Sequence, residues 1–365
     1  MNRKEELAHE FWGDLRIRND RDLHTLVSEL GRKDTTVKDR ASELAGFFLV
    51  DGRPLIRHSA LASIMELNRV DDHFEQIEQM LDDDYPMVRE AATVAMGRTT
   101  RDTEQLLVKL LRSPHTEVRF QAPISLVEKN YSSSAHEILK RLDEEGDQEI
   151  KTNLMIALGD LSYTEAINKV LELHKSHPYE IIRFEAAFTA TRLGDTSCSD
   201  FLLRYTTHDV YGENAVNALE AISNSIKDNK DVLRVLQKNF RKIFLSTERR
   251  ISIASLMVRL GDNRTLKYLE QRTSSFIFQT RMQALDKLGH TSSYDAARFL
   301  VSYIGKLTEK KRPEKETSVR AVLNICHDLK NNGNDITTLA GDLTTLSKDK
   351  NLDSETIKEI SDFVS

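Results

Sequence analysis

Two adjacent histidine–glutamate pairs, His9-Glu10 and His136-Glu137, are the residues of this sequence whose types could hold a transition metal. Each pair offers an imidazole nitrogen and a carboxylate oxygen, and a metal site needs further ligands from elsewhere in the fold. The remaining members of the 11 histidines are scattered along the chain. The sequence also lacks the C-x-x-C, H-E-x-x-H, G-x-S-x-G and G-x-x-x-x-G-K motifs. We therefore expect no metal site, no cofactor and no catalytic residue.

Basic side chains concentrate in residues 230–320, where they could steer an acidic partner toward the protein. This segment has 20 Lys and Arg against 9 Asp and Glu, a net charge of +11, whereas residues 1–229 have 28 against 41. Within KDVLRVLQKNFRKIF, we expect a buried face marked by Leu233, Leu236, Phe240, Ile243 and Phe244, and three of the basic residues share another face. For each group of basic residues taken alone, the alternative to a binding site is an ordinary solvent-exposed helix face. The sequence predicts a protein partner with an acidic surface and six partner-binding residues, which are Arg234, Lys238, Arg241, Arg249, Arg250 and Arg259.

The elements that position these side chains repeat along the chain. One position, which we call the anchor, is basic in seven of eight repeats: Arg57, Arg89, Arg119, Lys151, Arg183, Gly212, Arg250 and Arg281. From residue 57 to residue 281 is 224 residues over seven intervals, a mean of 32. Periods of this size are typical of stacked helical hairpins.

Two further columns support this alignment. Three residues after the anchor stands an alanine in six of eight repeats, and seven residues after it stands an apolar residue in all eight. Both offsets fall on one helix face, so we expect Ala92 and Ala186 to be buried between helices and Ser252 to lie on an exposed face. Glycines follow the anchor by eight or eleven residues, where left-handed helix ends are expected: Gly97, Gly159, Gly289, Gly194 and Gly261.

The stretches DDDYPMVREAATVAMGR and YEIIRFEAAFTATRLGD resemble HEAT repeats, of the short type named after phycobilisome lyases. The resemblance implies an all-α fold, an α-solenoid in which about nine to ten helical hairpins stack into a right-handed superhelix. We expect the solenoid over residues 34–322, with N-terminal capping helices in residues 1–33 and C-terminal capping helices in residues 323–365.

The recurring arginine lies beside acidic turns, so we interpret it as a structural ladder that joins neighbouring repeats. The main functional prediction is a non-catalytic scaffold, since extended helical arrays offer long binding surfaces. A nucleic-acid-binding protein is the first alternative, although Phe276 and Phe278 have the spacing of core residues and not of a stacking platform. Two cysteines in 365 residues and the absence of a long apolar run favour a cytoplasmic protein.

Three enzyme resemblances are weaker. Deoxyhypusine hydroxylase, built on similar repeats, holds two irons with four His-Glu pairs, and only His58 fits that pattern here, without its glutamate. Tetrapyrrole lyases share the repeat type, which by itself does not indicate a pigment. DNA glycosylases with HEAT-like repeats surround the damaged base with tryptophans, and this chain has one tryptophan, Trp12.

Overall fold

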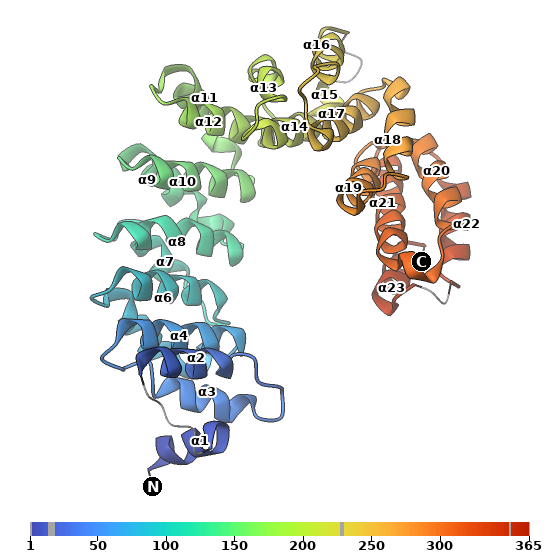
Figure 1. The fold of residues 1–365 in the computed structure, drawn as a ribbon. Helices are drawn as coiled ribbons and strands as arrows, with labels where there is room; N and C mark the ends of the chain where they lie inside the picture. The colour runs from blue at the N-terminus through green and yellow to red at the C-terminus, as the bar shows by residue number, and fades with distance from the viewer. Residues whose placement is uncertain (1, 14–18, 227–229, 350–351, 365) are drawn as a thin grey trace. The chain divides into compact units, whose positions relative to one another are not determined.

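The computed structural model describes residues 2–13, 19–226, 230–349 and 352–364. These residues form two compact units, Met1–Thr189 (unit 1) and Ala190–Ser365 (unit 2). Each unit is a stack of helical hairpins, and no strand occurs in the described part of either. The predicted all-α solenoid fold is therefore confirmed (Figure 1).

Unit 1 alternates first helices with longer second helices. The helices α2, α4, α6, α8 and α10 pack in succession and form one layer (Figure 1). The first helices flank this layer, and α12 runs across the boundary between the units. The bounds are α1 (Arg3–Trp12), α2 (Asp20–Leu30), α3 (Lys38–Gly46), α4 (Pro54–Glu66), α5 (Phe74–Gln79), α6 (Pro86–Arg98), α7 (Glu104–Leu110), α8 (Thr116–Glu128), α9 (Ala135–Glu144), α10 (Gln148–Asp160), α11 (Ile167–Ser176) and α12 (Glu180–Arg192).

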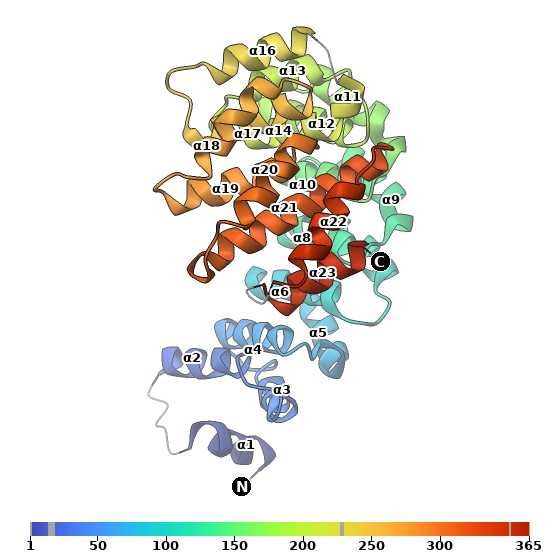
Figure 2. The same ribbon diagram turned by 90° about the vertical axis from the view of Figure 1, so that its right-hand side faces the viewer.

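Unit 2 repeats this plan with α14, α17, α19 and α21 as successive second helices. The last two helices close its end, since α22 packs on α20 and α23 packs on α21 (Figure 2). The bounds are α13 (Ser199–Tyr205), α14 (Gly212–Ala221), α15 (Ser223–Ile226), α16 (Lys230–Phe240), α17 (Thr247–Arg259), α18 (Leu266–Arg272), α19 (Phe278–Gly289), α20 (Tyr294–Ile304), α21 (Arg312–Asn331), α22 (Thr337–Leu346) and α23 (Ser354–Val364).

The two columns that follow the anchor form the core of the stack. All eight residues three positions after the anchor have no exposed surface, Ala92 and Ala186 among them. The eight residues at the seventh position are equally buried, with at most 2% exposed. Small side chains at the first column let neighbouring second helices approach closely, and the larger side chains fill the space beside them. The predicted packing face is thus confirmed.

Two expectations about single positions were wrong. Ser252 is completely buried, because its position two residues after the anchor faces the preceding second helix, α14, where its hydroxyl donates to the Glu213 carboxylate. Gly97 and Gly159 lie in the last turns of α6 and α10, and Gly289 is the last residue of α19, but none of the three has the left-handed conformation. At Gly289 a Cβ atom would lie 2.8 Å from the Ala321 Cα, so the glycine permits a close helix contact. Gly194 and Gly261 do have the left-handed conformation, with φ of 97° and 99°.

Candidate functional site: the lead-in turns

The anchor arginines of unit 1 join consecutive repeats. Arg57 donates two hydrogen bonds to the Asp83 carboxylate of the next repeat, at 2.7 and 2.8 Å, and a third to the Asp51 carbonyl of its own repeat at 2.8 Å. Arg89 likewise binds the Glu117 carboxylate at 2.5 Å and the Asp83 carbonyl at 2.6 Å. Asp83 therefore binds two anchor arginines: its carboxylate accepts hydrogen bonds from Arg57, and its carbonyl oxygen accepts one from Arg89. We call each such arginine contact a rung of the ladder.

The same geometry recurs farther along the chain. Arg119 binds Glu145 of the next repeat, and in unit 2 Arg281 binds Glu314. Both arginines also donate to the carbonyl six residues earlier, as Arg183 does. The ladder interpretation is confirmed, with one correction. The carboxylate comes from the turn that follows the arginine's own repeat, because the guanidinium extends toward the next hairpin.

Unit 2 compensates in a different way for the anchor position that has no basic residue. Gly212 stands at the anchor position of its repeat, and a Cβ atom there would lie 2.7 Å from the Arg249 guanidinium carbon. Arg249 reaches this position from α17 and pairs with Glu213 at 3.0 Å. Lys287 and Ser252 hold the same carboxylate at 2.8 Å each. Although burial favours the neutral acid, the hydrogen bond from Lys287 helps to keep the pKa of Glu213 below its ordinary value.

The six predicted partner-binding residues divide into two groups. Arg249, Arg250 and Arg259 have partners within unit 2, so they are not free cations on a docking surface. Arg250 donates to the Lys242 carbonyl at 2.8 Å, and Arg259 pairs with Asp328 at 2.8 Å and donates to Ser223 Oγ at 2.7 Å. Arg249 and Arg259 thus extend toward the second helices α14 and α21, whereas Arg250 folds back onto the residues that precede α17.

The other three predicted residues, Arg234, Lys238 and Arg241, are exposed on α16 and just beyond its end. Arg234 pairs only with Asp231 on the same helix, and both side chains are largely exposed. Lys238 and Arg241 form no hydrogen bond or ion pair with a side chain in the described ranges. Solvent-exposed cations of this kind remain available to a partner.

The exposed apolar side chains gather at one type of turn, which the sequence analysis missed. We call the residues that lead from a first helix into a second helix, with the first turn of that helix, the lead-in turn. Every exposed large apolar side chain among the described residues lies in a lead-in turn. They are Phe47, Val50, Leu55, Tyr85, Met87, Tyr179, Ile181, Val210, Ile243, Phe244, Phe276, Ile277 and Phe278. The opposite turns, which lead out of second helices, carry none among the residues described.

Two successive lead-in turns of unit 2 carry the most exposed of these residues. Phe244 is 99% exposed and Phe276 is 103% exposed, so neither ring packs against its own unit. The expectation that Phe276 and Phe278 are core residues was wrong, because both precede the buried part of α19. The expectation that Ile243 and Phe244 lie on a buried face was also wrong, because both precede α17 and lie in its lead-in turn. Exposed aromatic residues clustered on one edge indicate an interaction surface.

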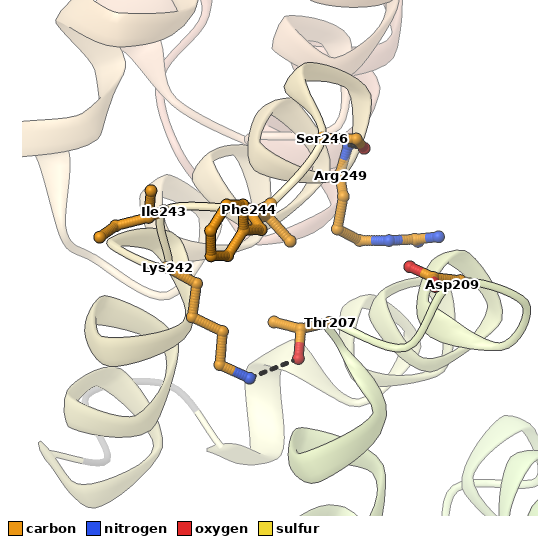
Figure 3. Close-up of a pocket in the computed structure, with 8 residues that line it drawn as sticks. Thr207, Asp209, Lys242, Ile243, Phe244, Ser246 and Arg249 are labelled. Carbon is orange, nitrogen blue, oxygen red and sulfur yellow. Dashed lines mark hydrogen bonds between the residues drawn. The ribbon is translucent and has the colours of Figure 1, made fainter.

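A cavity of about 430 Å³ opens between the lead-in turns at residues 206–211 and 241–246. Figure 3 shows Lys242, Ile243 and Phe244 on one side and Thr207 and Asp209 on the other. Lys242 Nζ donates to Thr207 Oγ1 at 2.6 Å across the cavity. The cavity thus combines an ammonium group with apolar walls, which suits an apolar side chain that has an acidic neighbour.

No group of three His, Cys, Asp or Glu side chains in the described ranges is arranged to hold a metal ion. Of the two histidine–glutamate pairs, His136 lies 3.5 Å from the Tyr163 hydroxyl and Glu137 pairs with Arg112 and Lys140. Across the described helices, none has the length and apolar composition that crossing a membrane requires.

Residues 74–159 match the family model for HEAT repeats. No curated protein sequence matches the chain. Among solved structures, importin beta is similar with a TM-score of 0.52 and 13% identity over 99% of this chain and 62% of its own. Kap95 in the Kap95:Nup1 complex is similar with a TM-score of 0.51 and 10% identity over 99% of this chain and 64% of its own.

The complex of CpcE and CpcF of phycocyanin lyase from Nostoc sp. PCC7120 matches with a TM-score of 0.47 and 18% identity, over 72% of this chain and 94% of its own. The chain spans less than two thirds of the importin beta and Kap95 chains. These likenesses concern the fold. The chain is an α-solenoid, and its residues 74–159 match HEAT repeats.

Proposed function

We propose that the protein is a non-catalytic scaffold that binds an acidic protein partner along the lead-in turns of unit 2. The observation that carries the proposal is the confinement of exposed apolar side chains to the lead-in turns, with the most exposed of them, Phe244 and Phe276, in consecutive turns of unit 2. Aromatic residues that become buried at an interface supply much of its binding energy. Kap95, whose fold is similar, is itself found in a complex with Nup1.

The charge of the surface determines the kind of partner. Lys238 and Arg241 are exposed and unpaired in the described part of the chain, and Lys242 lines the cavity beside Phe244. Residues 190–365 carry 27 Lys and Arg against 23 Asp and Glu, a net charge of +4. Such a surface attracts an acidic partner and speeds its association, and the attraction weakens as salt is added.

Binding by the partner would proceed in two stages. Long-range attraction would bring its acidic segment to the basic end of α16, and an apolar side chain would then enter the cavity between the turns at residues 206–211 and 241–246. Phe244 would be covered in the complex, which removes its ring from water. Arg250 would keep the turn in place through its bonds to the Lys242 and Leu245 carbonyls, whereas Arg249 lines the cavity and would contact the partner.

The test is affinity capture from native extract with the wild-type chain and two double variants. Arg241→Glu/Lys242→Glu reverses two charges on the lead-in turn, and Lys267→Glu/Arg298→Glu makes the same change at exposed residues of the first helices α18 and α20. We expect the first variant to lose an acidic protein that the control variant retains. Equal capture by all three chains, with unchanged melting temperatures, would contradict the proposed surface.

A nucleic acid is the second candidate ligand, and the exposure of Phe276 favours it, because bases stack on exposed aromatic rings. A labelled single-stranded oligonucleotide tests this directly. Binding that falls steeply with salt and is lost in both Phe276→Ser and Arg241→Glu/Lys242→Glu would assign the surface to nucleic acid.

A further inference from the structure

Unit 1 has its own exposed apolar residues on two consecutive lead-in turns. Val50 is 76% exposed, and Leu55, Tyr85 and Met87 are also exposed. Leu55 and Met87 occupy the same repeat position, two residues before their anchors. The bidentate contact between Arg57 and Asp83 joins the two turns, so these side chains belong to one edge of the stack.

The basic residues of this edge are already occupied. Arg53 pairs with both Asp51 and Asp20, and its guanidinium lowers the pKa of Asp51. Arg57 is held by Asp83 and lies 5.6 Å from the centre of the Tyr85 ring. A guanidinium with two hydrogen-bonded partners has little capacity left for a ligand.

The acidic residues of the same edge are not all occupied. Asp83 binds Arg57 and accepts a hydrogen bond from the Tyr85 backbone N–H at 3.0 Å. Its neighbours Asp82 and Asp84 are exposed, and neither forms a hydrogen bond or ion pair with any residue that the structure describes. Neither carboxylate therefore has a direct partner, in contrast to that of Asp83, although the charge of Asp84 contributes to raising the pKa of Arg57.

A cavity of about 440 Å³ lies beside these carboxylates. Val50, Gln76, Gln79 and Met80 contribute to its lining together with Asp82 and Asp84. Unit 1 carries 25 Lys and Arg against 35 Asp and Glu, a net charge of −10, so the wider field also attracts cations. Apolar contact and negative charge are offered by the same surface.

We propose that this edge of unit 1 binds a basic segment of a second protein, with Lys or Arg side chains on Asp82 and Asp84 and an apolar side chain against Val50, Tyr85 and Met87. An anionic membrane is disfavoured as the occupant, because the surface carboxylates repel its lipids. The site is distinct from the basic edge of unit 2 and does not depend on the function proposed for it. The protein would thereby link a basic partner to an acidic one.

The experiment selects ligands from a phage-displayed library of random 12-residue peptides on the immobilised full chain. Peptides that bind are synthesised, and their Kd values are measured for the wild type, for Asp82→Lys/Asp84→Lys and for Tyr85→Ser/Met87→Ser. Glu128→Lys/Glu165→Lys reverses two exposed charges at the opposite turns of unit 1 and is the matched control. Phe244→Ser separates this site from that of unit 2.

We expect one class of peptides with net positive charge and an aromatic or aliphatic residue. Its binding should weaken by at least about tenfold in both unit 1 variants and remain unchanged in the control and in Phe244→Ser. The proposal is overturned if no selected peptide distinguishes Asp82→Lys/Asp84→Lys from the wild type, or if the peptides that do so are acidic. Sedimentation that shows wild-type self-association, lost in the same variant, would instead assign the edge to a second copy of the chain.

Discussion

The two units share one repeat but leave different charges on their lead-in turns. In unit 1 the anchor arginines Arg57 and Arg89 bind carboxylates of the next repeat. The charges left unpaired at residues 82–87 are therefore the carboxylates of Asp82 and Asp84. In unit 2 the Gly212 position has no arginine, Arg249 fills it from α17, and exposed cations remain at Lys238 and Arg241. The comparison teaches that the recurring basic residue does not set the charge of the binding edge. The residues that the ladder leaves unpaired set it.

The largest difference between the units should appear when a rung is removed. Arg89→Ala leaves Glu117 and the Asp83 carbonyl without their cation in a mostly buried site, so we expect unit 1 to lose about 3 kcal/mol of stability. Arg249→Ala should cost about 1 kcal/mol, because Glu213 is partly exposed and keeps Lys287 and Ser252. Urea denaturation measures both values. Equal losses would show that Arg249 is a rung of the same kind as Arg89.

Lowering the pH should reduce the stability of unit 1, because Glu145 becomes protonated. Burial alone would raise the pKa of this carboxyl group, but hydrogen bonds from the Asp147 backbone N–H, Arg141 and Arg119 lower it to about 2. Since the folded-state pKa lies below the ordinary value of 4.5, the stabilisation is present above pH 4.5 and is lost as the pH falls toward 2. The ionised Glu145 side chain thus contributes about 3 kcal/mol to the free energy of unfolding.

Thermal unfolding of the wild type and Glu145→Gln between pH 2.5 and 7 tests this contribution. The two melting temperatures should converge as the pH falls, because protonation removes from the wild type the charge that glutamine removes from the variant. A constant gap across this range would mean that Glu145 does not titrate with folding.

The smallest effect concerns Gly212. A Cβ atom there would overlap the Arg249 guanidinium and lie 3.0 Å from the Thr206 carbonyl oxygen. Gly212→Ala should therefore cost about 1 kcal/mol in the wild type and much less when combined with Arg249→Ala. If the losses of stability in the two single variants add up in the double variant, the Arg249 side chain does not occupy the space beside Gly212.

The sequence was sufficient for the repeat and its core. Columns at fixed offsets from the anchor require only helical periodicity, and Ala92 and Ala186 are buried as expected. The failures occur where a residue's surroundings come from another repeat. Ser252 is buried because Glu213 approaches it from α14, 39 residues away in sequence. The spacing of apolar residues on one helix contains no information about such a contact.

The residues of the proposed binding edge in unit 2 were predicted in part. Excess positive charge identified the region of Arg234, Lys238 and Arg241, but charge alone could not separate these residues from Arg249, Arg250 and Arg259, which have intramolecular partners. The exposed phenylalanines were assigned to the core because apolar residues usually are buried. A usable signal was present, since large apolar residues recur two to seven positions before the anchor, in turns where polar residues are expected.

Site-specific photo-crosslinking tests the central claim most directly, namely that partners bind the lead-in turns. A photoreactive phenylalanine analogue would replace Phe244 or Phe276, and in a control chain it would replace Lys267, an exposed residue of α18. After irradiation in native extract, we expect positions 244 and 276 to capture the same acidic protein and position 267 to capture none of it. Capture of that protein at position 267, with none at 244 or 276, would contradict the account.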